Sequence, residues 1–164
     1  DIVERVEDDY LVYHDRLKQL LVLDTGKNVA PGPIEDGFAT SDRVEQIMVM
    51  GDSQKFVSAL VVPDIEAIRR WAESEGIDIP DTNEAICRDD RVHEYVQQEV
   101  DRVNEGFEKY ERIKEFRMVP AEWTPENDLL TPSMKVKRRK VLERFSEAYD
   151  EIYGEQAARA AADD

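Results

Sequence analysis

The hydrophobic positions of the chain form several short β-prone runs. Residues 44–50 (VEQIMVM) and 56–62 (FVSALVV) are apolar runs joined by the polar GDSQK, which predicts an antiparallel hairpin. Both runs are nearly continuous, so we expect both faces of these strands to be covered. Residues 10–14 and 19–23 predict two earlier strands, and residues 115–119 (EFRMV) predict a later one.

Apolar residues recur at spacings of three and four in three other stretches, which predicts three helices. The first begins after the cap Asp64 and ends by Gly76. The second begins at Asp89 or Asp90 and carries an apolar stripe of Val92, Val96, Val100, Val103 and Phe107. The third carries Val141, Phe145, Ala148 and Ile152. The predicted fold is α+β, a small mixed sheet with antiparallel hairpins packed against about three helices.

Two segments lack these patterns. Pro31 and Pro33 in residues 29–35 (VAPGPIE) disfavour both a helix and a central strand, which predicts a constrained loop. The tail, residues 154–164, has nothing large to bury, so we expect it to fray.

Composition narrows the possible functions. The 164 residues suit one domain, and 38 acidic against 22 basic residues give a net charge of −16, which repels nucleic acid and anionic membranes. Such acidity resembles that of proteins from salt-loving organisms.

One cysteine, Cys87, and two histidines cannot form a common zinc site, so we expect no metal site. No signal peptide or transmembrane run is evident, which favours the cytoplasm.

Five cations lie close together just before the third predicted helix: Lys135, Lys137, Arg138, Arg139 and Lys140. We call them the basic island. One interpretation is a solvated start of the helix. Because cations at a helix N-terminus oppose the helix dipole, the island otherwise needs an anion from a phosphate-bearing ligand or an acidic partner. Lys135, on the preceding loop, could contact two anionic oxygens at once.

Residues 15–35 (DRLKQLLVLDTGKNVAPGPIE) are the second candidate passage. The TGKN within it fits a hairpin turn. It does not match the phosphate-binding loop of nucleotide hydrolases, because the pattern G-x-x-x-x-G-K-[ST] is absent.

The two passages together resemble the C-terminal domain of the AMP-forming acyl-CoA synthetases, in the adenylate-forming superfamily that includes luciferase. DRLKQLLVLDTGKNVAPGPIE is followed about a hundred residues later by LLTPSMKVKRRKV. The segments VEQIMVMGD, ALVVPD and VNEGFEKYERIKEF are most similar to the long-chain fatty acid branch. The resemblance covers residues 1 to about 153.

The resemblance implies a lid domain of a long-chain fatty acid–CoA ligase, whose large N-terminal domain is missing and whose substrates are fatty acid, ATP and CoA. Residues 1–14 would end the preceding domain and form a first hairpin strand, residues 15–18 would be the hinge, and residues 19–153 the lid. Alone, such a fragment is expected to be inactive. Association with a membrane would come only through the missing domain.

The resemblance also implies roles for individual residues. Lys135 matches the lysine that enters the active site during adenylation, and Met134 stands where the family often has glycine. Lys18 would be the hinge residue. Asp1 and Arg16 would contact the AMP ribose. The loop with Gly26 and Lys27 would line the pantetheine channel of CoA. Mg²⁺ would neutralise the departing pyrophosphate.

Two other functions remain open from the sequence. The chain could be a non-catalytic module of the same fold that binds an acidic partner through residues 135–140. Nucleic-acid binding through the same island is a third possibility, which would make the affinity fall steeply with salt.

Overall fold

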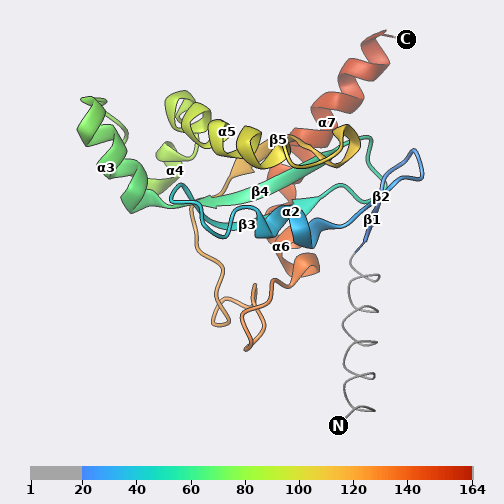
Figure 1. The fold of residues 1–164 in the computed structure, drawn as a ribbon, viewed down its shortest axis with the longest axis horizontal. Coiled ribbons are helices and arrows are strands. Elements are labelled where there is room, and N and C mark those ends of the chain that lie inside the picture. Colours follow the sequence, from blue (N-terminus) through green and yellow to red (C-terminus); the bar gives the residue numbers. More distant parts are fainter. Residues whose placement is uncertain (1–19, 164) are drawn as a thin grey trace.

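A computed structural model describes the backbone of residues 20–163 and the side chains of residues 20–154. A three-stranded sheet lies at its centre, in the order β3–β4–β5 (Figure 1). Strands β3 (Val44–Met50) and β4 (Val57–Pro63) pair antiparallel, whereas β4 and β5 (Ile113–Met118) pair parallel. The predicted hairpin and α+β class are therefore confirmed.

Helices cover both faces of this sheet. Between β4 and β5 the chain forms α3 (Ile65–Glu75), α4 (Asn83–Ile86), α5 (Asp90–Asn104) and a short 3₁₀ helix (Lys109–Glu111). After β5 it forms α6 (Arg138–Arg144) and α7 (Ser146–Asp163). Figure 1 shows α3 and α5 on one side of the sheet and α6 on the other.

Strand β4 separates two hydrophobic cores. All seven of its residues are buried, and successive side chains point to opposite faces. Val57, Ala59 and Val61 join the core beneath α5, which also holds Ile68, Val92, Val96, Val100 and Phe116. Leu60 and Val62 join the second core, which holds Trp123, Leu129, Leu130, Val141, Ile152 and Tyr153. The continuous hydrophobicity of residues 56–62 is explained by this double coverage, as predicted.

The predicted helix caps of α3 and α5 are confirmed. The Asp64 side chain accepts a hydrogen bond from Ala67 N at 3.1 Å, and Asp89 caps α5. Gly76 ends α3 with φ 69°, a left-handed conformation that glycine adopts without a Cβ clash. Helix α5 ends at Asn104, so Phe107 packs against the first core from beyond the helix.

Pro31 and Pro33 belong to a helix rather than to the predicted loop. Helix α2 spans Pro31–Asp36 and ends at Gly37. Both prolines lie in its first turn, where the backbone N–H groups have no partner within the helix, so proline costs little there. The prediction failed because position within a helix decides the effect of proline.

The closing helix is broken where the sequence predicts continuity. Phe145 adopts φ −113° and ψ 36°, and separates α6 from α7. All four residues of the predicted stripe still pack in or against the second core. Helix α7 continues to Asp163, through the tail for which we expected fraying, and the alanines there are strong helix formers.

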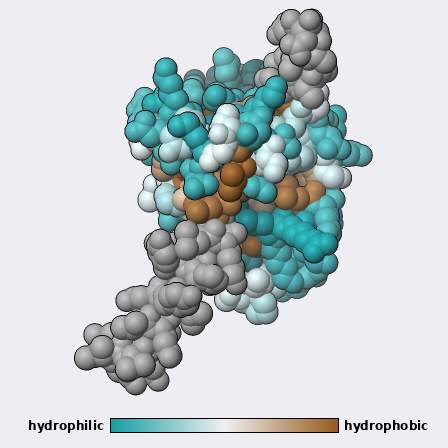
Figure 2. Space-filling model, turned by 90° about the vertical axis from the view of Figure 1, so that its right-hand side faces the viewer, coloured by the Kyte–Doolittle hydropathy of each residue, from teal (hydrophilic) through white to brown (hydrophobic). Residues whose placement is uncertain are grey.

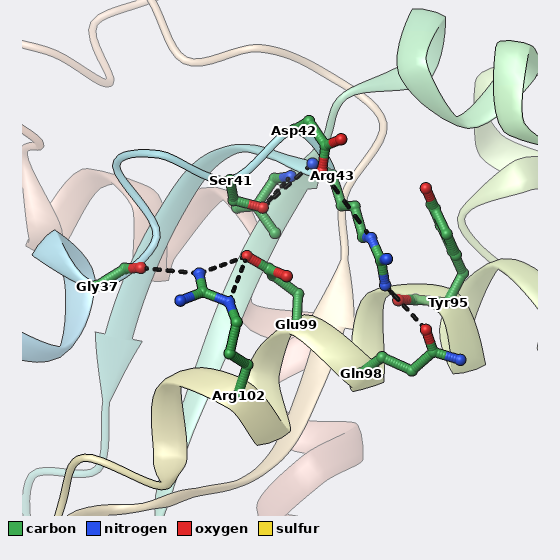
Figure 3. Close-up of polar contacts among 9 residues, drawn as sticks. Gly37, Ser41, Asp42, Arg43, Tyr95, Gln98, Glu99 and Arg102 are labelled. Atoms are coloured by element: carbon green, nitrogen blue, oxygen red, sulfur yellow. Dashed lines mark hydrogen bonds and ion pairs between the residues drawn. The ribbon is translucent and has the colours of Figure 1, made fainter.

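A polar cluster joins the loop before β3 to α5 (Figure 3). Nη1 of Arg43 donates to Tyr95 O at 2.8 Å and to Gln98 Oε1 at 3.0 Å, and the guanidinium stacks 3.9 Å from the Tyr95 ring centroid. Arg102 pairs with the buried Glu99 and donates to Gly37 O at 3.3 Å. A Cβ on Gly37 would lie 2.7 Å from Val103 Cγ1, so glycine permits this close approach.

The face drawn in Figure 2 is mainly hydrophilic. Figure 2 shows one face, on which a small group of apolar residues interrupts charged and polar ones. No helix within the described part of the chain combines the length and apolar character needed to cross a membrane.

Candidate functional site

Lys135 lies on a short hairpin between β5 and α6. Thr131 N donates to Lys135 O at 2.8 Å and Lys137 N donates to Leu129 O at 2.9 Å, with a β-bridge between Leu130 and Val136. The turn consists of residues 132–134. Because Leu129 and Leu130 are buried in the second core, the base of this hairpin is fixed to the body of the domain while its tip extends outward.

The Lys135 side chain is exposed at this tip. Among the described residues it makes no hydrogen bond or ion pair with another side chain. An ammonium group on a flexible stem, held on a fixed loop, can approach anionic oxygens without first breaking a contact inside the domain.

Met134 precedes Lys135 in a left-handed conformation, with φ 68°. This conformation costs a non-glycine residue about 1–2 kcal/mol. A glycine, which the resemblance implies is frequent at this position, would adopt it without that cost. Met134 is 63% exposed, so burial within this domain does not offset the conformational cost.

The other four cations of the basic island are paired inside the domain. Lys137 and Lys140 both contact Asp128, the latter at 3.5 Å, and Arg139 pairs with Glu143 at 3.3 Å. The hydrogen bond from Lys137, assisted by its charge and by Lys140, lowers the pKa of Asp128. The anion that we expected from a ligand or partner is thus supplied by the chain itself.

Arg138 has a structural role at the free edge of the sheet. It donates to Glu35 Oε1 at 2.7 Å and to Val49 O at 3.2 Å, while Glu35 Oε2 accepts from Val49 N at 2.8 Å. These contacts satisfy the outward backbone groups of Val49 on the edge strand β3. Glu35 also ties α2 to α6.

Gly26 and Lys27 lie in the turn of a second hairpin. Strands β1 (Leu21–Val22) and β2 (Asn28–Val29) pair antiparallel, and Gly26 has φ 87°, which favours glycine. Lys27 Nζ lies 4.7 Å from the centroid of the Tyr110 ring. The turn predicted for TGKN is confirmed.

The two candidate loops lie in separate places. In Figure 1 the β1–β2 hairpin and the orange segment between β5 and α6 occupy different parts of the molecule. The domain therefore does not unite Gly26 and Lys135 in one site. Asp1, Arg16 and Lys18 lie outside the described residues.

Sequence analysis did not single out Thr131, Asp128 or Glu35. A hydroxyl residue before proline is typical of a turn, so the TPS motif offered a signal for Thr131. No local signal marks Glu35, because its partner Arg138 is 103 positions away.

Cys87 and His93 line a hollow between α4, α5 and the junction of α6 with α7. Burial, followed by the charge of Glu84, raises the pKa of the Cys87 thiol to about 11, so this cysteine is a poor nucleophile at neutral pH. The His93 ring stacks on Phe116 with centroids 4.3 Å apart. Burial, with the nearby charge of Arg117, lowers the pKa of His93.

His93 should make the domain less stable in mild acid. Since its folded-state pKa is lowered, the unfolded chain takes up a proton near pH 6.5 while the folded chain resists it, so stability falls as pH falls through that window. Urea denaturation between pH 7.5 and 5.5 should show a steeper loss for the wild type than for His93→Gln. Equal losses would contradict this assignment.

Comparison with known proteins identifies the family. The model of the AMP-binding enzyme C-terminal domain matches residues 18–157. The long-chain-fatty-acid–CoA ligase FadD15 of Mycobacterium tuberculosis is 32% identical over 154 residues, 92% of this chain and 25% of the ligase. Human long-chain-fatty-acid–CoA ligase 1 is 33% identical over 142 residues, 85% of this chain and 20% of the ligase.

A solved structure agrees with these relatives. The adenylation domain of a carboxylate reductase from Mycobacterium chelonae is 29% identical with a TM-score of 0.68, over 85% of this chain and 20% of that one. The chain spans a quarter or less of the length of the two ligases named above. The family match covers most of the sequence, and the chain therefore belongs to the AMP-binding enzyme C-terminal domain family, with long-chain fatty-acid–CoA ligases as its homologues.

Proposed function

We propose that this chain is the lid domain of a long-chain fatty acid–CoA ligase that converts fatty acid, ATP and CoA to acyl-CoA, AMP and pyrophosphate. The observation that carries the proposal is the exposed ammonium of Lys135, which has no partner among the described residues. It lies on a hairpin anchored in the core, within a basic island whose other members are paired. The large domain would hold most of the substrate site, and the fragment alone would be inactive. The cytoplasm is the proposed compartment.

Lys135 would act in the first half-reaction. The fatty carboxylate attacks the α-phosphate of ATP, which releases pyrophosphate and leaves acyl-AMP. This step brings two anions together, so an ammonium that contacts both stabilises the charge developing in the transition state and aligns the reactants. No group of three His, Cys, Asp or Glu suited to a metal ion occurs among the described residues. Mg²⁺ would neutralise the departing pyrophosphate in this step.

The second half-reaction needs a different face of the lid. The CoA thiol attacks the acyl carbonyl and displaces AMP, and a lid that carries Lys135 into the site must move away first. Rotation at Lys18 would withdraw Lys135 and bring the Gly26 turn to the CoA channel. The separation of the two hairpins in Figure 1 supports this division of roles. In the same proposal, Asp1 and Arg16 contact the AMP ribose.

The alternative function, docking of an acidic partner through residues 135–140, receives less support. Asp128, Glu35 and Glu143 already pair with four of the five cations. A partner would have to displace these carboxylates or rely on Lys135 alone.

Replacing the hinge tests the proposal in the complete ligase. Lys18→Pro fixes φ and should hold the lid in one orientation, so acyl-AMP formation should persist while thioester formation falls at least about tenfold. Pyrophosphate exchange measures the first step, and single-turnover release of acyl-CoA from preformed acyl-AMP measures the second. Lys18→Ala is the matched control and should retain both. Absence of acyl-AMP formation in the wild type would refute the proposed function, whereas an unaffected second step in Lys18→Pro would refute only the hinge.

A further inference from the structure

We infer that Thr131 is a positioning residue for Lys135 in the adenylation step, an inference that rests on the proposed function. Its hydroxyl oxygen accepts a hydrogen bond from the backbone N–H of Lys135 at 3.1 Å, and its own N–H donates to Lys135 O at 2.8 Å. Thr131 therefore holds the backbone of the lysine from both sides.

The remaining polar groups of Thr131 bind the same turn. Its carbonyl accepts from Met134 N at 2.8 Å, and its hydroxyl lies 3.1 Å from Ser133 Oγ. Every polar group of this side chain and backbone is thus directed at residues 133–135. The two backbone bonds belong to the turn and do not depend on the side chain, whereas the contacts of the hydroxyl to Ser133 and Lys135 need a threonine or a serine.

The hydroxyl matters because the turn is strained. Met134 holds φ 68°, a conformation that a side chain with a Cβ disfavours, so the turn tends to relax unless its neighbours fix it. The bond from Lys135 N–H to the Thr131 hydroxyl closes the turn directly after the strained residue. Without it, relaxation at Met134 would rotate the following residue and redirect the lysine stem.

Thr131 also connects the tip to the core. It follows Leu129 and Leu130, each 3% exposed, whereas the Lys135 side chain is exposed. On the other strand, Lys137 is tied to Asp128. Both strands of the hairpin are thus anchored below Thr131. The contacts of its hydroxyl and its N–H to the Lys135 backbone are the last ones before the Lys135 side chain, so they set the direction in which that side chain extends.

The test compares Thr131→Val with Thr131→Ser in the complete ligase. Valine keeps the shape and removes the hydroxyl, and serine restores the hydroxyl. Misplacing Lys135 should lower the maximal rate of acyl-AMP formation about tenfold in Thr131→Val and leave thioester formation from preformed acyl-AMP unchanged. Thr131→Ser should recover the rate to within about twofold. Ser133→Ala, which removes only the neighbouring hydroxyl, should have a smaller effect.

The thioester step serves as the internal control for folding. Equal losses in both half-reactions, or no loss in either, would overturn the positioning role, as would failure of serine to restore the rate. Lys135→Ala in the same assays separates the positioning role of Thr131 from the proposed role of Lys135. If Lys135→Ala shows a selective adenylation defect but Thr131→Val does not, only the positioning role fails; if neither variant shows it, the proposed function of Lys135 fails as well.

Discussion

Replacing Lys135 by alanine should slow acyl-AMP formation in the complete ligase by about 10²–10³-fold, the usual cost of removing one electrostatic contact to a transition state. Thioester formation from preformed acyl-AMP should stay within about twofold of the wild type, because the proposed rotation would withdraw the lysine in that step. Pyrophosphate exchange and single-turnover release of acyl-CoA measure the two steps separately. Lys135→Arg keeps the charge but replaces a compact ammonium with a rigid fork, so it should recover only part of the rate.

The matched control is Arg139→Ala. Arg139 carries the same charge four positions along, and its side chain is 91% exposed. Among the described residues it pairs only with Glu143, one helical turn away. Removing it changes the net charge by as much as Lys135→Ala does, yet both half-reactions should remain within about twofold. Equal defects from the two substitutions would show that the island acts through its overall field, and would contradict a specific role for Lys135.

Trp123→Ala should produce the largest loss of stability. The ring is 1% exposed in the second core, and Gln46 hydrogen-bonds both its backbone N–H, at 2.7 Å, and its carbonyl, at 2.8 Å. Truncating a fully buried tryptophan leaves a cavity and costs about 3–5 kcal/mol of unfolding free energy. Urea denaturation measures the loss. Trp123 lies in the segment that leads to the Lys135 hairpin, so the cavity should loosen the support of that hairpin. The rate of acyl-AMP formation should therefore fall even at temperatures where the protein is still folded.

Trp71 supplies the comparison. It is the other of the two tryptophans, lies partly exposed on α3 and stacks on Tyr95 with centroids 4.0 Å apart. Trp71→Ala should therefore cost only about 1–2 kcal/mol and leave adenylation unchanged. A smaller loss for Trp123→Ala than for Trp71→Ala would mean that the second core is not closed as the structure shows.

Local patterns accounted for much of the fold. Strands β3 and β4 and helices α3 and α5 were predicted because continuous apolar runs, three-to-four spacing and acidic caps act within a few residues. The predictions failed at α2, where the prolines lie in the first turn and cost little, and at Phe145, where packing against a neighbouring core decides the outcome. Helix α2 contacts β3 through Glu35, and the break at Phe145 still lets the residues on both sides reach the second core.

The sequence by itself determined the sheet-forming runs, the capped helices and, through two motifs, the family and the candidate Lys135. Only the tertiary structure decided which cations of the basic island have a carboxylate partner among the described residues. Asp128 and Glu35 pair with Lys137 and Arg138 across 9 and 103 positions, contacts that exist only after the chain has folded. The number of cations in the island follows from the sequence, whereas which of them can bind an external anion depends on the carboxylates that folding places beside them.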